Sequence, residues 1–457
     1  MCTGPLFKKI LVFTFPIMLS NLLQILFNMA DTVVVGRFSA EGSDALAAVG
    51  TTTSIIYLVI NAAIGLSVGT NVLVSRYYGA KDYRRLDAAV HTSILIALVI
   101  GAICSVVGVW LTPALLRMVG APDDILPMAE VYMKIYFAGF ISVSVYNFGS
   151  AILRAVGDTQ RPLIFMLISG ILNIVLNLFF VITLNMSVDG VALATIISQA
   201  VSAVLIIITL MKSTSSYRLE LKKIRCDWLA AKQIALVGIP AGIQSSLFSI
   251  SNTMVQSSIN SFGKAVIAGN TAASNVENLT YTILNSIQFA ALAFTGQNIG
   301  AGKLDMVKQV LKKCLLLNLI AGIGVFGLVY LAGEPLLNIY DVQDPAIMEA
   351  GLIRFKYVTS IGLLCSLMEI YAAMMRGFGH SIQPMIVTLI GSCAMRMLWL
   401  QFIFPLHRTL DMVYIVYPIS WILTVAAHIV CYQIAYKKLR RQLAPPQTSM
   451  AEEATAV

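Results

Sequence analysis

Four polar side chains recur at helical spacing in the first apolar stretch of the chain. They are Asn21, Gln24, Asn28 and Asp31, and at roughly 100° per residue they fall within about 80° of arc. A lipid-facing helix surface would not tolerate this stripe, so it must face a cavity or another helix. Asp31 is its most informative member, because a carboxylate in a low-dielectric environment favours binding of a proton or a cation. The alternative is that Asp31 lies at the outer end of its helix and meets water or Arg37.

A second group of polar residues carries oxygen atoms suited to a hard cation. Its members are Asn173 and Asn177, one helical turn apart, and, on one face of the next apolar stretch, Thr195, Ser198, Gln199 and Ser202. Carbonyl and hydroxyl oxygens beside a carboxylate are what a hard cation requires. They are equally what a polar helix–helix interface requires. The residues alone leave both interpretations open.

The second half of the chain repeats the polar stripe without its carboxylate. The stripe consists of Ser245, Ser249, Asn252 and Gln256. Val255 takes the place of Asp31. The second half is therefore expected to have a polar wall that lacks an acid at that point.

Charged residues do occur elsewhere in the second half. Glu277, which shares a polar face with Tyr281, and Glu369 lie within apolar stretches, and Arg396 is the one clear cation predicted inside the membrane. Buried charges usually pair, so one of the two glutamates is expected to form an ion pair with Arg396. Alternatively, a free glutamate binds a cationic substrate. Both interpretations stay open.

Membrane-spanning helices must position these side chains. Of the 457 residues, 58% are hydrophobic and 12% are charged, with a mean hydropathy of +0.83, whereas an average soluble domain is about 25% charged. This composition excludes an ordinary soluble enzyme and predicts an all-α polytopic membrane protein, because about 20 apolar residues suffice to cross a bilayer. Twelve spans are predicted, near 8–36, 47–73, 88–112, 127–149, 163–184, 189–211, 233–259, 265–294, 313–333, 346–373, 384–405 and 412–436.

Lysine and arginine are distributed asymmetrically between the predicted loops. An even number of spans puts both termini on one side, and the segments on that side hold most of the basic residues, including the clusters at 76–85, 212–232 and 437–441. The positive-inside rule places both termini in the cytoplasm of a multi-pass plasma-membrane (bacterial inner-membrane) protein. This topology accounts for the net charge of +9, so no nucleic-acid partner is expected.

The two halves of the chain repeat one another. Pro16 matches Pro240, Gly79 matches Gly300, and the set Arg154, Gly157 and Pro162 matches Arg376, Gly379 and Pro384 with identical internal spacing. Six spans in each repeat give both halves the same orientation, which predicts two six-helix lobes related by a pseudo-two-fold axis along the membrane normal. Internal repeats with a site between them are typical of transporters. The expected parts are a first lobe (1–211), a cytoplasmic linker (212–232), a second lobe (233–436) and a basic, disordered cytoplasmic tail (437–457). The alternative for the linker is a solvated loop that contacts lipid head groups.

Several of these motifs together resemble one known family. Pro16 followed by the stripe to Asp31-Thr32-Val33-Val34-Val35-Gly36, together with Gly79-Ala80-Lys81, the stretch 154–159 and the stretch 296–302, is similar to the MATE (multidrug and toxic compound extrusion) transporters over residues 8 to 440. The resemblance implies a V-shaped pair of six-helix lobes. It also implies export of bulky, often cationic or amphipathic compounds, driven by inward flow of protons or sodium ions, with no cofactor.

The resemblance also implies roles for individual residues. Asp31 matches the first-helix aspartate of the DinF-like branch, Asn173 and Thr195 match its partners, and Asn177 replaces a residue that is often aspartate. These four form the implied coupling site, which is a metal site only if sodium is the coupling ion. Pro16 matches a proline at which the first helix is proposed to bend. A glutamate typical of the NorM-like branch is missing near Phe248, which favours the DinF-like branch.

The sequence therefore predicts a secondary active multidrug exporter that works by alternating access. The expected substrate cavity is lined by Asn21, Gln24, Asn28, Gln199, Ser249, Asn252, Gln256, Glu277, Tyr281, Glu369 and Arg396. Its expected partners are small drug-like or cationic molecules and membrane lipids, and the protein is expected to be a monomer. The nearest alternative is a lipid-linked oligosaccharide flippase, which would need a strongly cationic cavity. A membrane enzyme is disfavoured because no catalytic cluster of His, Asp, Glu or Ser is evident near one bilayer face.

Overall fold

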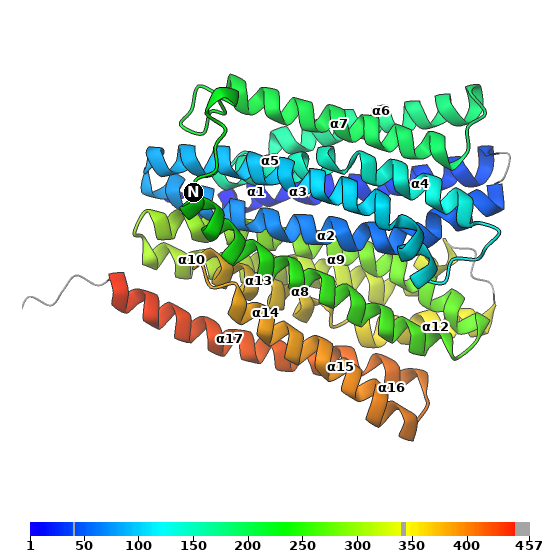
Figure 1. The fold of residues 1–457 in the computed structure, drawn as a ribbon. Coiled ribbons are helices and arrows are strands. Elements are labelled where there is room, and N and C mark those ends of the chain that lie inside the picture. The colour runs from blue at the N-terminus through cyan, green and yellow to red at the C-terminus, as the bar shows by residue number, and fades with distance from the viewer. Residues whose placement is uncertain (40–41, 340–343, 444–457) are drawn as a thin grey trace, which may run out of the picture.

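A computed structural model describes residues 1–39, 42–339 and 344–443 of the chain, and these residues form a bundle of long, nearly aligned helices (Figure 1). The described N-terminus and the end of the last helix lie at the same end of this bundle. The expected tail at 437–457 begins inside that helix, and its part from 444 onward lies outside the described residues.

The first lobe consists of the helices before the linker. They are α1 (Leu6–Phe38), α2 (Gly42–Ala80), α3 (Tyr83–Met118), α4 (Leu126–Ala138), α5 (Phe140–Val156), α6 (Gln160–Leu178), the π-helical turn η1 (Phe179–Thr183) and α7 (Val188–Lys212). The fourth predicted span is broken, because α4 and α5 meet at Gly139 with a bend of 46°. Its continuous hydrophobicity gave no sign of this break.

The second lobe begins at Trp228. It contains α8 (Trp228–Asn260), α9 (Lys264–Gly300), α10 (Leu304–Leu331), α11 (Gly333–Asn338), α12 (Pro345–Arg354), η3 (Phe355–Thr359), α13 (Gly362–Gly377), α14 (Ile382–Thr388), η4 (Leu389–Ala394), α15 (Met395–Leu398), η5 (Trp399–Ile403), η6 (Phe404–Leu406), α16 (Leu410–Tyr414) and α17 (Val416–Leu443). The predicted tenth and eleventh spans are thus interrupted by π-helical turns, a feature often found near functional sites.

Ten stretches of the described helices are long and apolar enough to cross a membrane, and the bent pair α4–α5 makes an eleventh. The twelfth spanning element of the described chain is α9, which has 37 residues but is too polar to meet the same criterion. Large apolar side chains on outward helix faces are exposed, for example Val106 at 71% and Trp110 at 78%. This pattern fits a surface that contacts lipid rather than water.

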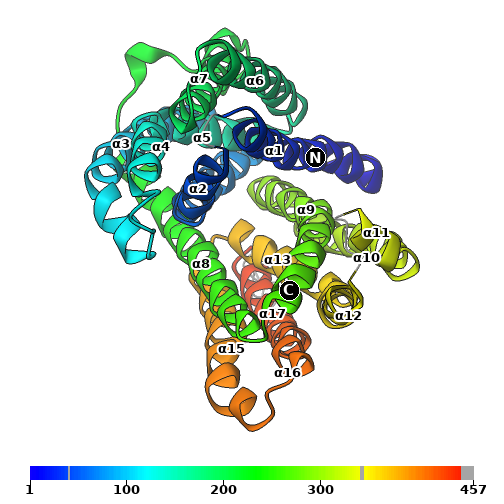
Figure 2. The same cartoon turned by 90° about the vertical axis from the view of Figure 1, so that its right-hand side faces the viewer.

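The repeat seen in the sequence is visible in the backbone. Lys81 and Gly302, at the ends of matching helix–helix turns, have φ angles of 57° and 69°, and Gly157 and Gly379 have φ angles of 105° and 80°. Left-handed backbone conformations therefore recur at equivalent points of the two lobes. Seen along the bundle, α1 to α7 form one group and α8 to α17 the other (Figure 2).

The two lobes meet along α2, which packs against α8 and α9. Gly65 lies so close to α8 that an added Cβ would fall 2.3 Å from Gly242 Cα, and at Gly69 an added Cβ would fall 2.2 Å from the Ile234 carbonyl oxygen. Gly65 and Gly69 have the GxxxG spacing that is typical of closely packed membrane helices, and both lie in close contact with α8.

The linker between α7 and α8, which includes the short turn η2 (Leu221–Lys223), is anchored to α3. The Glu220 backbone N–H donates to His91 Nε2 over 3.0 Å, and the Asp227 N–H donates to Thr92 Oγ1 over 3.0 Å. Tyr217 is 9% exposed and Leu219 is 1% exposed. The linker is thus packed against the first lobe at these points rather than being solvated throughout its length.

Candidate functional site

The four residues of the expected coupling site are joined by hydrogen bonds across three helices of the first lobe. Asn177 Nδ2 donates to Asp31 Oδ1 over 2.5 Å and approaches Asn173 Oδ1 at 3.3 Å. Asn173 Nδ2 in turn donates to Thr195 Oγ1 over 3.4 Å. Because α1, α6 and α7 each contribute to this network, it links α1 to two helices that are distant from it in sequence.

Burial gives this network its chemical character. Asn173 is 5% exposed and Asn177 is fully buried. The Asn177 Oδ1 atom accepts no hydrogen bond from the described residues. A buried acceptor beside a carboxylate can meet the O–H of a protonated Asp31 or a small cation after the amide group rotates. The geometry therefore suits either ion.

A cavity of about 350 Å³ lies next to this network in the first lobe. Asp31, Asn21, Gln24, Asn28 and Gln199 line it, as expected from the sequence. Gln24 donates to Asn28 over 3.2 Å, and Asn28 donates to the Tyr57 hydroxyl over 2.9 Å. The polar stripe of α1 thus lines a cavity. The contacts of Asp31 with Asn177 and with this cavity differ from the alternative, in which Asp31 contacts only Arg37 or bulk water.

The sequence did not single out the aromatic lining of this first-lobe cavity. Tyr57, Tyr132, Tyr136 and Phe289 line it, and the rings of Tyr132 and Tyr136 stack at 6.4 Å between centroids. Phe289 comes from α9 of the second lobe. Arg154 also lines the cavity, with its guanidinium carbon 5.0 Å from the Phe289 ring centre. Tyrosines at helical spacing in α4 were a signal for this wall.

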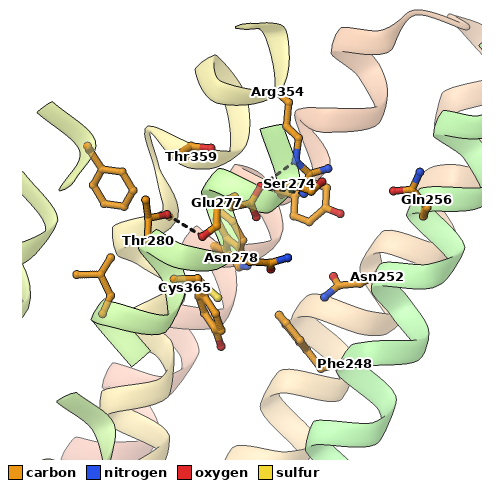
Figure 3. A pocket seen from close by; sticks show the side chains of 16 residues that line it. Phe248, Asn252, Gln256, Ser274, Glu277, Asn278, Thr280, Arg354, Thr359 and Cys365 are labelled. Carbon is orange, nitrogen blue, oxygen red and sulfur yellow. Dashed lines mark hydrogen bonds and ion pairs between the residues drawn. The ribbon is translucent and has the colours of Figure 1, made fainter. Parts of the chain in front are cut away.

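The second lobe has a cavity of its own, of about 260 Å³ (Figure 3). Asn252 and Gln256 from α8 and Glu277 and Tyr281 from α9 line it. The single substrate cavity predicted from the sequence is therefore wrong in this respect, because its expected residues divide between two cavities. The reason is that each lobe encloses its own polar helix faces.

Three residues expected to line the substrate cavity, Ser249, Glu369 and Arg396, are not part of the lining of this second-lobe cavity. Ser249 donates to the Ser245 carbonyl oxygen within α8 over 3.1 Å. Glu369 forms an ion pair with Arg376 at 3.9 Å, on the same helix α13. Arg396 also lies behind the cavity wall, where Asn252 accepts a hydrogen bond of 2.8 Å from its Nη1.

The ion pairs expected for Arg396 are not formed. Glu277 pairs with Arg354 instead, with Glu277 Oε2 2.8 Å from both Nε and Nη2 of Arg354. The prediction that Arg396 is the one clear cation within the membrane is also wrong, since Arg354 is 7% exposed and Arg376 is 5% exposed. Arg354 is the last residue of α12, directly before the π-helical turn η3, and its side chain is buried.

Pro16 lies within the continuous helix α1. Proline has no N–H, so a helical hydrogen bond is lost at this point. The Ser20 hydroxyl donates to the Pro16 carbonyl oxygen over 2.9 Å. Asn21, one residue further, reaches across to the second lobe and donates to Ser286 Oγ over 3.2 Å. The weakened part of α1 therefore adjoins a contact between the lobes.

Two repeated six-helix lobes, each with a polar cavity inside an apolar exterior, define a polytopic transporter rather than an enzyme. The model of one family, MatE, matches residues 16–179 and 240–399. The chain belongs to the MatE family, so the resemblance to MATE transporters seen in the sequence is confirmed.

The chain is similar to named relatives along most of its length. It is 26% identical over 441 residues to the probable multidrug resistance protein YoeA of Bacillus subtilis, with 94% of each chain covered. It is 27% identical over 392 residues to the probable multidrug resistance protein NorM of Thermotoga maritima, with 84% of this chain and 82% of the relative covered. A crystal structure of MATE in the bent conformation has the same fold, with a TM-score of 0.89 at 23% identity over 97% of this chain and 98% of the other.

Proposed function

We propose that the protein is a multidrug exporter that exchanges organic cations or amphipathic compounds for H⁺ or Na⁺. Family membership and the multidrug-resistance names of the relatives support export, and they do not favour lipid-linked oligosaccharides as substrate. We further propose that the protein acts as a monomer with both termini in the cytoplasm and that its coupling site is of the DinF-like kind.

One observation carries the proposal for coupling: Asp31 lies both in the hydrogen-bonded network with Asn177 and in the lining of the first-lobe cavity. An anionic Asp31 attracts a cationic substrate into this cavity. A proton or sodium ion that enters from outside neutralises the carboxylate, with Asn173, Asn177 and Thr195 as the neighbouring polar groups. Substrate and coupling ion therefore compete for one charge, which is the linkage that exchange requires.

The neutralisation of Asp31 is proposed to act on α1. Once neutral, Asp31 no longer needs the donor from Asn177 as strongly, and the helix can repack between Pro16 and Asp31. Because Asn21 contacts Ser286 across the lobes, a movement of α1 is transmitted to the second lobe. The result is the outward release of substrate by alternating access.

The test is efflux of ethidium, a fluorescent organic cation, from proteoliposomes under a pH gradient and a Na⁺ gradient imposed separately. We expect movement under one of them, which names the ion, and its loss in Asp31→Asn. The matched control is Asp123→Asn, which removes an exposed carboxylate from the loop before α4. Normal gradient-driven efflux by Asp31→Asn would refute the coupling role.

A further inference from the structure

The guanidinium group of Arg396 in the second lobe is buried among aromatic rings. Arg396 is 1% exposed, and its guanidinium carbon lies 4.4 Å from the ring centre of Tyr417, 5.3 Å from that of Phe248 and 5.7 Å from that of Trp421. Its Nε donates to Ser420 Oγ over 3.1 Å and its Nη1 to Asn252 Oδ1 over 2.8 Å. The rings face a cation favourably, but every direct partner of this charge is neutral.

No carboxylate in the described part of the chain forms an ion pair with Arg396. The two nearby glutamates are already paired, Glu277 with Arg354 at 2.8 Å and Glu369 with Arg376 at 3.9 Å. Within each pair, the negative charge of the glutamate cancels the positive charge of the arginine. Arg396 therefore leaves this region of the second lobe with one uncompensated positive charge, in surroundings where an unpaired charge is costly.

Two buried donors beside this charge also lack acceptors. Arg396 Nη2 and Trp421 Nε1 make no hydrogen bond to the described residues. Trp421 is 4% exposed, and its ring is one of the three that contact the guanidinium group. Buried donors are normally hydrogen-bonded. Two donors without acceptors, both beside a cationic group, are suited to hydrogen-bond the oxygen atoms of an anion.

A cavity adjoins this donor pair. Phe248, Asn252, Tyr417 and Trp421, all of which contact Arg396, line the second-lobe cavity of about 260 Å³. Phe248 and Asn252 point into it from α8, opposite Glu277 and Asn278 (Figure 3). The volume is near the lower end of small-molecule sites, about 300 Å³, and its walls combine flat aromatic surfaces with amide groups.

We propose that the second-lobe cavity is a binding site for an aromatic organic anion, a carboxylate or a phosphate monoester. The anionic oxygens accept hydrogen bonds from Arg396 Nη2 and Trp421 Nε1, and the aromatic ring packs in the cavity against Phe248. Phe248 and Asn252 both contact the guanidinium group and both line the cavity, so the proposal requires these two side chains to shift when the anion binds. This site is separate from the cation site proposed for the first lobe and goes beyond that function.

The probe is 1-naphthoate, with uncharged 1-naphthamide as its isosteric control, each titrated into the purified full-length protein by calorimetry at pH 7.5. We expect naphthoate to bind at least about ten-fold more tightly than naphthamide, because hydrogen bonds to a charged group are roughly twice as strong as neutral ones. Equal affinity for the two compounds in the wild type would overturn the proposal.

Two variants shift the charge of the cavity in opposite directions. Arg396→Gln removes the uncompensated cation and is expected to lower the affinity for naphthoate about ten-fold. Glu277→Gln removes the carboxylate that pairs with Arg354, which makes the net charge around the cavity more positive. We therefore expect this variant to bind naphthoate more tightly. General damage to the fold would weaken binding in both variants, so weaker binding by Glu277→Gln contradicts the proposal. Asp123→Asn serves as the neutral control for loss of a carboxylate.

The source of the anion is tested with lipid. Naphthoate binding is measured in nanodiscs of phosphatidylcholine alone and of phosphatidylcholine with phosphatidylglycerol. A soluble aromatic anion as occupant predicts the same affinity in both. Loss of naphthoate binding in the anionic nanodiscs would overturn the proposed occupant and assign the donors to a lipid phosphate.

Discussion

Asn177 connects the Asp31 carboxylate to the rest of the first lobe. Its amide nitrogen lies 2.5 Å from Asp31 Oδ1, and its oxygen has no donor among the described residues. A hydrogen bond to a charged acceptor contributes about 1.5–3 kcal/mol. This one residue therefore stabilises the empty, anionic form of the site and can also offer an oxygen to a bound ion.

Replacing Asn177 with aspartate should tighten binding of the coupling ion. A second carboxylate next to Asp31 makes the empty site repulsive, and either ion relieves this repulsion. We expect the external ion concentration at half-maximal ethidium efflux to fall by about ten-fold, which corresponds to ~1.4 kcal/mol. A rise in that concentration would count against the proposed site.

The variant Asn177→Ala is expected to affect proton binding and sodium binding in opposite directions. It removes the donor that stabilises the anionic carboxylate, so proton binding should tighten, whereas sodium binding should weaken because an oxygen ligand is lost. The same efflux assay, run under the effective gradient, reports the direction. An unchanged half-maximal concentration for Asn177→Ala would mean that the residue is only a structural neighbour.

Helical spacing predicted which residues share a face but not which faces meet. The stripe from Asn21 to Asp31 could be read from the sequence because four polar residues at helical spacing cannot face lipid. The ion-pair partner of Glu277 could not be predicted from the sequence, since periodicity does not say whether α9 packs against α12 or against α15. The identity of an ion pair depends on the packing of helices and on local π-helical turns, neither of which the residue pattern encodes.

At the scale of elements, α2 is in close contact with α8 of the second lobe. An added Cβ at Gly65 would lie 2.3 Å from the backbone of α8, while an added Cβ at Gly50 of the same helix would meet no described residue within 4 Å outside its own helical turn. The two glycines therefore provide a matched pair, one in contact and one open.

Gly65→Ala is expected to destabilise the protein by about 1–3 kcal/mol, as overpacking does, because α2 and α8 must separate. Gly50→Ala should leave stability unchanged or raise it slightly, since alanine is the better helix former. The melting temperature of the detergent-purified protein, followed by tryptophan fluorescence, distinguishes them. Equal melting temperatures would show that the lobes are not held together at this contact.

The elements themselves were predicted with uneven success. Twelve spans were expected, and most helices extend several residues beyond them, because their ends leave the apolar core of the bilayer. The break at Gly139 was missed because both sides of it are apolar. Conversely, the span near 265–294, which corresponds to α9, was predicted despite its polarity, and its polar residues Glu277, Asn278 and Tyr281 line the second-lobe cavity.

At the scale of the molecule, hydrogen bonds between the lobes gather at the end that bears the termini. Arg76 donates to the Gly377 carbonyl oxygen over 3.2 Å, Gln297 to that of Ala155 over 2.7 Å, and Tyr77 to the Gln233 side chain over 2.8 Å. Helices α2 and α9 are in close contact here as well. Alternating access requires these contacts to break and re-form as the lobes rock against each other.

A reversible cross-link at this end should therefore stop transport. An added Cβ at Gly296 would lie 3.1 Å from Ser75 Cβ, close to the 3.5–4.5 Å typical of disulfides. In a background without the seven native cysteines, we expect Ser75→Cys/Gly296→Cys to lose ethidium efflux on oxidation and to regain it on reduction, while Ser75→Cys alone is insensitive to oxidant. Mass spectrometry verifies that the disulfide has formed. Full efflux by the oxidised double variant would mean that substrate is transported without separation of the lobes at this end. Movements of α1 within a fixed bundle, rather than rocking of whole lobes, would then have to account for transport.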